Sequence, residues 1–284
     1  MASMLQAAVN PTSLENIGTI CIVLDLSKPG NCVESLLFWL SAVKEHCQRA
    51  LQDLQNSKIE KFRVINEKRS KYWNQVPAQN ERNSIQPSLI PITVIGAKYD
   101  LFANAFEPKV KKILCSALRY ICHTNGCDLV FSSMKEQQPL KLFKNMLGWH
   151  SFRDFQRQEA APAQEGEEAK QDVAVAQMSV PDKRLDADHA ISVCAGYDNL
   201  LKIGEPHGAG NRSNVSIDRL WQEEVENNFK KVKSDESTVG GLPNMAKNRE
   251  EKVDKMRAQK DLELEDYRRE IERAKRFEKS KLLN

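Results

Sequence analysis

TICIVL, residues Thr19–Leu24, is an unbroken run of apolar and mostly β-branched side chains, and it decides the fold class. The run ends in Asp25–Gly30 (DLSKPG), a segment with the composition of a loop. Continuous hydrophobicity without alternation is typical of a strand buried on both faces, as in a parallel sheet that helices cover. We therefore expect residues 19–24 to form such a strand.

Strand-like and helix-like segments alternate after this run. Two further apolar runs, Pro91–Ile95 and Leu129–Phe131, predict strands. Apolar residues spaced by three and four predict the helices between and after them. These helices run from Val33 to about Leu54 with Pro77 as the latest end, from Glu107-Pro108 to Asn125-Gly126, and around Leu140, Phe143, Met146 and Leu147. The order predicts an α/β fold with a parallel sheet and flanking helices.

Changes in composition divide the chain into five predicted parts. They are an irregular N-terminus (1–18), the α/β core (19–156), a flexible insertion rich in Ala, Gln and Glu (157–185), a region with a short strand and a helix (186–245), and a charged C-terminal helix (246–284). In the fourth part, the strand is expected at Ile191–Gly196 and the helix at Ile217–Val232.

The C-terminal helix carries a narrow apolar stripe among its charges. Its members recur mostly at three or four residues, and they are Val253, Met256, Leu264, Tyr267, Ile271 and Ala274. One interpretation is a solvated single helix held by ion pairs between successive turns. The other is a helix whose stripe docks on a partner at the coiled-coil period, and we favour this one.

Composition excludes several classes of protein. The 284 residues are 40% apolar and 29% charged, with a formal net charge of +3 that gives no basic footprint for nucleic acid. No apolar run approaches the roughly 18 residues of a membrane span, and the N-terminus lacks the pattern of a secretory signal. We expect a soluble, cytosolic protein with neither nucleic acid nor membrane as a partner.

The seven cysteines raise the question of a metal site. Cys115, Cys122, Cys127 and His123 lie close together in the sequence, but without a CxxC pair. Free cysteines behave mainly as small apolar residues, so we favour buried thiols over zinc ligands and expect no metal. An odd number of cysteines without a signal peptide also favours reduced thiols over disulfides.

Two fragments follow predicted strands, where nucleotide-binding α/β folds place their ligands. Ala97–Asp100 (AKYD) resembles the guanine-reading N/T-K-x-D motif of G domains, with Lys98 and Asp100 in the matching positions and Ala97 in place of Asn or Thr. Ser132 and Ser133, in SSMK, resemble the S-A-K loop that meets the base, although Ser replaces Ala and Lys comes one place late.

The parts that would handle phosphates are missing from the sequence. It contains no G-x-x-x-x-G-K-[ST] loop, and no D-x-x-G precedes the first strand. It also lacks G-x-S-x-G, H-E-x-x-H and a Gly-rich dinucleotide loop. We therefore expect no enzymatic activity and no cofactor.

Four segments together resemble the light intermediate chain family of cytoplasmic dynein. They are Ile22–Pro29, Val94–Asp100, Ala195–Asp198 with Ile203-Gly204, and Asp254–Arg268, of which the last closely resembles the ciliary, type 2 branch. The resemblance runs from about Thr19 to Arg269.

This resemblance implies a G-domain-like, P-loop-NTPase-like fold in a subunit without catalytic activity. Such a subunit binds and stabilises the tail of the dynein 2 heavy chain, contacts other dynein 2 subunits, and serves the intraflagellar transport machinery indirectly. It implies roles in retrograde transport, cilium assembly and cilium length control, at the cytoskeleton, cilium and basal body or centrosome. It also implies that Lys98, Asp100, Ser132 and Ser133 are a vestigial guanine site without function.

The chain departs from the family at its start. Met1–Gly18 has neither strand-like runs nor Gly-rich loops. By comparison with a G domain, the chain is therefore expected to begin at the fourth strand and to be a shortened form. In such a form residues 20–24 lie at an open edge of the sheet. Two other functions stay open. One is a guanine-nucleotide switch related to small GTPases, and the other is a coiled-coil scaffold that binds through residues 246–284.

Overall fold

A computed structural model describes residues 8–11, 13–14, 17–152, 180–211, 214–231 and the C-terminal positions 255–256, 259–260, 262–269, 271 and 273. The described residues up to 231 belong to one compact unit and those from 255 onward to another, and each is described by itself.

A four-stranded sheet with the order β1-β2-β3-β4 forms the centre of the first unit. Its strands are β1 (Ile20–Asp25), β2 (Ile92–Ala97), β3 (Asp128–Phe131) and β4 (Ser192–Val193). β1, β2 and β3 run parallel, as the sequence predicts, with Ile20 opposite Ile92 and Thr93 opposite Asp128. β4 pairs antiparallel with β3, so the sheet is mixed rather than wholly parallel. β1 lies at the edge, which confirms its predicted place.

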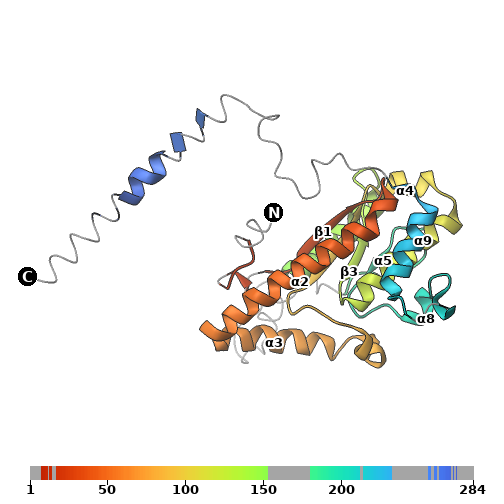
Figure 1. The fold of residues 1–284 in the computed structure, drawn as a ribbon, viewed down its shortest axis with the longest axis horizontal. Helices are drawn as coiled ribbons and strands as arrows, with labels where there is room; N and C mark the ends of the chain where they lie inside the picture. The colour runs from red at the N-terminus through yellow and green to blue at the C-terminus, as the bar shows by residue number, and fades with distance from the viewer. Residues whose placement is uncertain are drawn as a thin grey trace, which may run out of the picture. The chain divides into compact units, whose positions relative to one another are not determined.

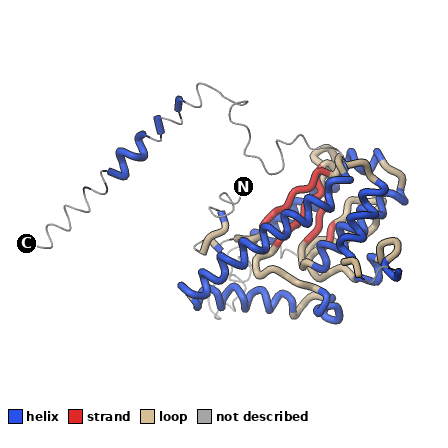
Figure 2. Tube along the Cα trace, viewed as in Figure 1, coloured by secondary structure: helices blue, strands red, loops and turns tan. Residues whose placement is uncertain are grey.

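Helices connect and cover the strands (Figures 1 and 2). They are η2 (Pro29–Asn31), α2 (Cys32–Ser57), α3 (Ile59–Trp73), η3 (Pro77–Ser84), α4 (Tyr99–Ala105), α5 (Pro108–Thr124), α6 (Gln137–Phe152), α8 (Leu200–Ile203), η4 (Ala209–Asn211) and α9 (Ile217–Asn228). The α/β class predicted from the sequence is confirmed. Helix α9 stops at Asn228, earlier than the predicted Val232, and Phe229 after it is buried in an extended conformation.

One face of the sheet is covered by a continuous helical layer. α2 packs on β1, α5 packs on β3, and α9 contacts both helices (Figure 1). Ile22 and Leu24 of β1 point into this layer and are buried. Burial of such apolar side chains contributes about 1.5–3 kcal/mol each, which makes this layer the main core.

On the opposite face, α6 packs on β3. His150 of α6 contacts Asp128, and the strand register places Thr93 and Cys21 on the same face as Asp128. On this face Thr93, Ile95 and Val130 are buried, whereas Cys21 is exposed and Val23 is 62% exposed. The prediction that the first strand is buried on both faces is therefore wrong, because Cys21 and Val23 of β1 stay exposed on the face where α6 packs on β3.

The three cysteines near His123 in the sequence are buried, as we expect for apolar thiols. Cys115, Cys122 and Cys127 are buried free thiols, and burial raises the pKa of Cys115 and Cys127 to about 12. His123 points elsewhere, since its Nε2 lies 2.8 Å from Glu81 Oε2. The described residues hold no cluster of potential metal ligands and no helix long and apolar enough to cross a membrane.

The C-terminal positions of the second unit that the structure describes are helical. The stripe residues among them, Met256, Leu264, Tyr267 and Ile271, are exposed. The predicted stripe members Val253 and Ala274 lie outside the described residues, as does most of the predicted flexible insertion, 157–179. The choice between a solvated helix and a docking helix stays a prediction.

Candidate functional site

The predicted site residues meet at the carboxyl ends of the three parallel strands. Lys98 and Asp100 follow β2, while Ser132 and Ser133 follow β3. Since parallel strands end at the same edge of a sheet, the loops that follow them come together there. Asp25, the last residue of β1, lies at the same edge.

Asp100 is the centre of the cluster. Ser133 Oγ donates a hydrogen bond of 2.8 Å to Asp100 Oδ1, and Lys135 Nζ lies 3.2 Å from Oδ2. The hydrogen bond from Ser133, together with Lys135, holds the pKa of Asp100 below its ordinary value. The structure thus brings the two sequence fragments together, with the carboxylate ionised and both of its oxygens engaged.

Lys98 points toward β1 rather than toward Asp100. Its Nζ donates a hydrogen bond of 2.7 Å to Asp25 Oδ2. Burial alone would raise the pKa of Asp25, but hydrogen bonds from Lys98 and Ser27 outweigh burial and lower it. Lys98 is also the one non-glycine residue among those described with a positive φ, 61°, just before α4 begins. Such a conformation costs about 1–3 kcal/mol and is maintained only where surrounding contacts fix it.

Backbone hydrogen bonds connect the two loops directly. Tyr99 N donates to Ser132 O over 3.0 Å, and Ser132 N donates to Gly96 O over 2.8 Å. Ser132 and Ser133 are buried, so their positions are fixed by packing as well as by these bonds. The cluster is therefore a rigid, mutually paired set of charges and hydroxyls.

Chemically, the cluster offers one ionised hydrogen-bond acceptor, the carboxylate of Asp100, which lies next to the buried Ser133. The carboxylate of Asp100 can accept hydrogen bonds from the N–H groups of a ligand only if these replace Ser133 or Lys135. Among the described contacts of the cluster there is no neutral base. The predicted residues omitted the two partners, Asp25 and Lys135. Asp25 ends β1 and Lys135 lies four residues after β3, and their pairing depends on how the loops approach each other, which the sequence pattern does not show.

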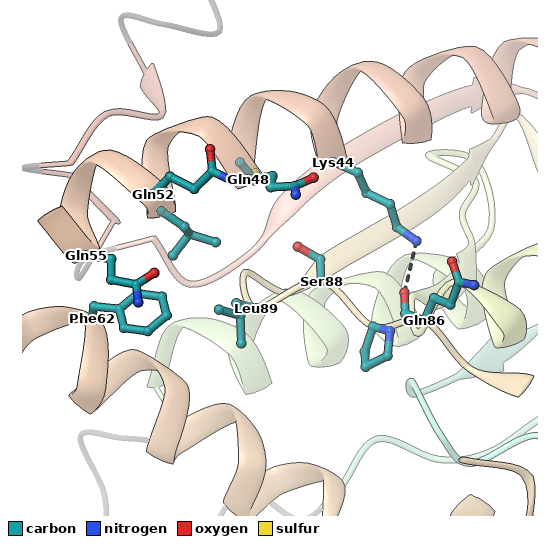
Figure 3. Close-up of a pocket in the computed structure, with 11 residues that line it drawn as sticks. Lys44, Gln48, Gln52, Gln55, Phe62, Gln86, Ser88 and Leu89 are labelled. Atoms are coloured by element: carbon teal, nitrogen blue, oxygen red, sulfur yellow. Dashed lines mark hydrogen bonds between the residues drawn. The ribbon is translucent and has the colours of Figure 1, made fainter. Parts of the chain in front are cut away.

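A groove of about 460 Å³ lies elsewhere, between α2, the start of α3 and the extended segment 86–89 (Figure 3). Gln48, Gln52 and Gln55 line its α2 side, and Leu89 and Phe62 line the opposite side. Lys44 Nζ at one end donates to Gln86 O over 2.9 Å, as the dashed line shows. Burial lowers the pKa of Lys44. None of the predicted site residues lines this groove, and nothing in the sequence pattern pointed to it.

Comparison with known proteins shows which chains this one resembles. The family model described as Dynein light intermediate chain (DLIC) matches residues 1–86. The human protein called Cytoplasmic dynein 2 light intermediate chain 1 is 28% identical over 259 residues, which is 88% of this chain. The rat protein of the same name is 29% identical over 279 residues, or 94% of this chain. The chain is thus similar to dynein light intermediate chains, through a family model over its first 86 residues and through these relatives along most of its length.

The match covers these relatives only in part. This chain spans 65% of the length of the human relative and 70% of the rat relative. A solved structure, described as the Crystal Structure of the Dynein Light Intermediate Chain's Conserved Domain, aligns with a TM-score of 0.41 and 16% identity, over 78% of this chain and 68% of that one.

Proposed function

We propose that this chain is a non-catalytic subunit of the cytoplasmic dynein 2 motor. In this role it binds and stabilises the tail of the dynein 2 heavy chain, contacts other dynein 2 subunits, and serves retrograde intraflagellar transport, cilium assembly and cilium length control. Its place would be the cytoplasm, the microtubule cytoskeleton and the cilium with its basal body. The observation that carries the proposal is the similarity to dynein 2 light intermediate chains along 88–94% of this chain.

The strand-end cluster supports a binding role rather than a catalytic one. Phosphoryl transfer depends on positioning and charge stabilisation of the phosphates, and the sequence has no G-x-x-x-x-G-K-[ST] loop for either. Both carboxylate oxygens of Asp100 already have internal partners. We propose that Lys98, Asp100, Ser132 and Ser133 are a vestigial guanine site that now joins two loops of the core.

Co-precipitation of the full chain with the tail of a dynein 2 heavy chain tests the subunit role. We expect retention of the heavy-chain tail, and we expect most of it to persist when residues 246–284 are removed, because the α/β unit makes the main contact. Loss of all binding on that deletion would favour the coiled-coil scaffold instead. No retention by the full chain would contradict both.

A guanine-nucleotide switch is the second candidate, and the arrangement of Lys98, Asp100 and Ser133 at the strand ends is the observation in its favour. Equilibrium dialysis with labelled GDP separates the two functions. The subunit role predicts no binding to this chain, whereas the switch predicts binding that falls when Asp100→Ala removes the acceptor. The control is Asp53→Ala, at an exposed position on α2.

A further inference from the structure

The groove beside α2 has a half-buried ammonium group at one end (Figure 3). Lys44 Nζ donates to Gln86 O over 2.9 Å and to Asn125 Oδ1 over 2.7 Å, and both acceptors are neutral. An ammonium group has three N–H donors, so one donor of Lys44 has no partner among the described residues. Asp218 and the thiol of Cys127 act on its charge from a distance, but burial outweighs them and lowers the pKa of Lys44.

This ammonium group favours a ligand with a carboxylate. Partial burial removes part of the water around the charge of Lys44, and among the described residues no carboxylate forms an ion pair with it. A carboxylate that entered the groove would accept the third N–H in a charge-assisted hydrogen bond, which is shorter and stronger than a neutral one. It would also supply the counter-ion that the fold does not provide.

A row of carboxamides continues from Lys44 along α2. Gln48, Gln52 and Gln55 follow at spacings of four and three residues, so they share one face of the helix. Their side chains are exposed, and they make no hydrogen bond among the described residues. A carboxamide carries both donors and an acceptor, as a peptide unit does.

The spacing of this row fits an extended polypeptide. Gln48 and Gln52 lie about 6 Å apart along the helix axis, and every second residue of an extended chain repeats after roughly 6.6 Å. The other lining includes apolar side chains, of which Leu51 is buried and Phe62 and Leu89 are partly buried. An extended chain turns alternate side chains to opposite sides, so it can meet the polar row and the apolar wall together.

We propose that this groove binds an extended segment of a partner polypeptide, with an Asp or Glu side chain held by Lys44 and the backbone held by the glutamine row of α2. All residues that line the groove belong to the described part of the chain, and the volume of about 460 Å³ is within the usual range of ligand pockets. The inference does not depend on the dynein role, because it rests on the groove alone.

Selection by the full chain from a library of acetylated, amidated heptapeptides tests the proposal. We expect the selected sequences to share one acidic position. Exchange of that acidic residue for its amide should weaken binding about tenfold or more in fluorescence anisotropy, because the charge-assisted hydrogen bond is lost. Binding should also weaken as the salt concentration rises.

A charge change at Lys44 locates the site. Lys44→Gln should weaken binding of the acidic peptide about tenfold or more, and it should leave binding of the amide form of the same peptide nearly unchanged. Lys141→Gln is the matched control, because Lys141 on α6 is exposed and does not line the groove. It should bind the acidic peptide as the wild type does.

Lys44 also connects α2 to Gln86 and Asn125, so a second pair of variants leaves it in place. Gln48 is exposed and lies one turn from Lys44, where Gln48→Glu supplies the missing counter-ion from within the chain. Gln48→Glu should weaken binding of the acidic peptide about threefold or more, and Gln48→Lys should strengthen it by a similar factor.

Several results would overturn the proposal. One is a library that yields no binding sequence, or sequences without a shared acidic position. Another is binding that neither Lys44→Gln nor Gln48→Glu changes. Displacement of the peptide by acetate, at an ionic strength where chloride does not displace it, would show that the groove takes a small carboxylate instead of a polypeptide.

Discussion

His150 Nε2 lies 2.9 Å from Asp128 Oδ2, and both side chains are buried between α6 and the sheet. Ala195 N donates to the other carboxylate oxygen over 2.9 Å, and Thr93 Oγ1 donates to Oδ2 over 3.3 Å. Burial alone would raise the pKa of Asp128, but His150 and the bond from Ala195 outweigh it and lower the pKa. This one carboxylate therefore connects α6, β2, β3 and the segment after β4.

Replacing Asp128 by Asn should lower the free energy of unfolding at neutral pH by about 1.5–3 kcal/mol, the net contribution of hydrogen bonds to a charged group. A depressed pKa in the folded state means that the carboxylate stabilises the fold above its unfolded pKa of about 3.9 and loses this effect as the pH falls further. Urea unfolding over a pH series should show the difference between wild type and Asp128→Asn shrinking below about pH 4. Asp53→Asn, at an exposed position, is the control, and equal stability of all three proteins at pH 7 would contradict the prediction.

The buried pair of Arg119 and Asp198 predicts a large effect from a single truncation. Arg119 Nε and Nη2 donate to the two oxygens of Asp198 over 2.8 and 2.7 Å, with both side chains less than a tenth exposed. Arg119→Ala leaves the Asp198 charge buried without its partner and should cost about 3–5 kcal/mol in urea unfolding. Arg219→Ala is the matched control. It breaks an exposed pair with Glu223 at 3.5 Å and should cost less than about 1 kcal/mol.

The strands and helices that follow strong local patterns could be predicted from the sequence. β2 and α5 are examples, because every residue of Ile92–Ile95 is β-branched and Pro108 opens a run with apolar residues at spacings of three and four. The end of α2 gave no such signal. The helix ends at Lys58, which has φ −145° and ψ 67°, although this residue is neither Gly nor Pro.

What the sequence could not provide was the relation between distant segments. Val23 has the same apolar character as Ile22, but Val23 is exposed and Ile22 is buried, because segments from later in the chain pack on one face of β1 and not on the other. Likewise the motif resemblance singled out Lys98 and Asp100 as a pair. In the fold they have different partners, Asp25 and Ser133, because the loops after three strands converge.

Gly96 permits the close contact of β2 with two neighbouring side chains. A Cβ at this position would lie 2.6 Å from Phe131 Cδ1 and 2.9 Å from Leu26 Cδ1, in a strand that is buried. Gly96→Ala should therefore destabilise the protein by about 1–3 kcal/mol through overpacking. Gly210→Ala, where an added Cβ meets nothing within 4 Å, should be neutral or slightly stabilising in the same thermal unfolding assay. Equal melting temperatures for the two variants would show that the core around Phe131 yields more easily than its packing suggests.

Ser133 should control the ionisation of Asp100. Its hydroxyl is the largest of the interactions that lower the pKa of Asp100, so Ser133→Ala should move that pKa up toward its ordinary value. Carboxyl ¹³C shifts followed through an acid titration measure this directly. Ser27→Ala is the matched control, because Ser27 Oγ donates to Asp25 over 2.6 Å and its loss should raise the pKa of Asp25 while leaving Asp100 unchanged. An Asp100 titration that is the same in Ser133→Ala and wild type would mean that Lys135, at 3.2 Å, holds the carboxylate ionised without help from the serine.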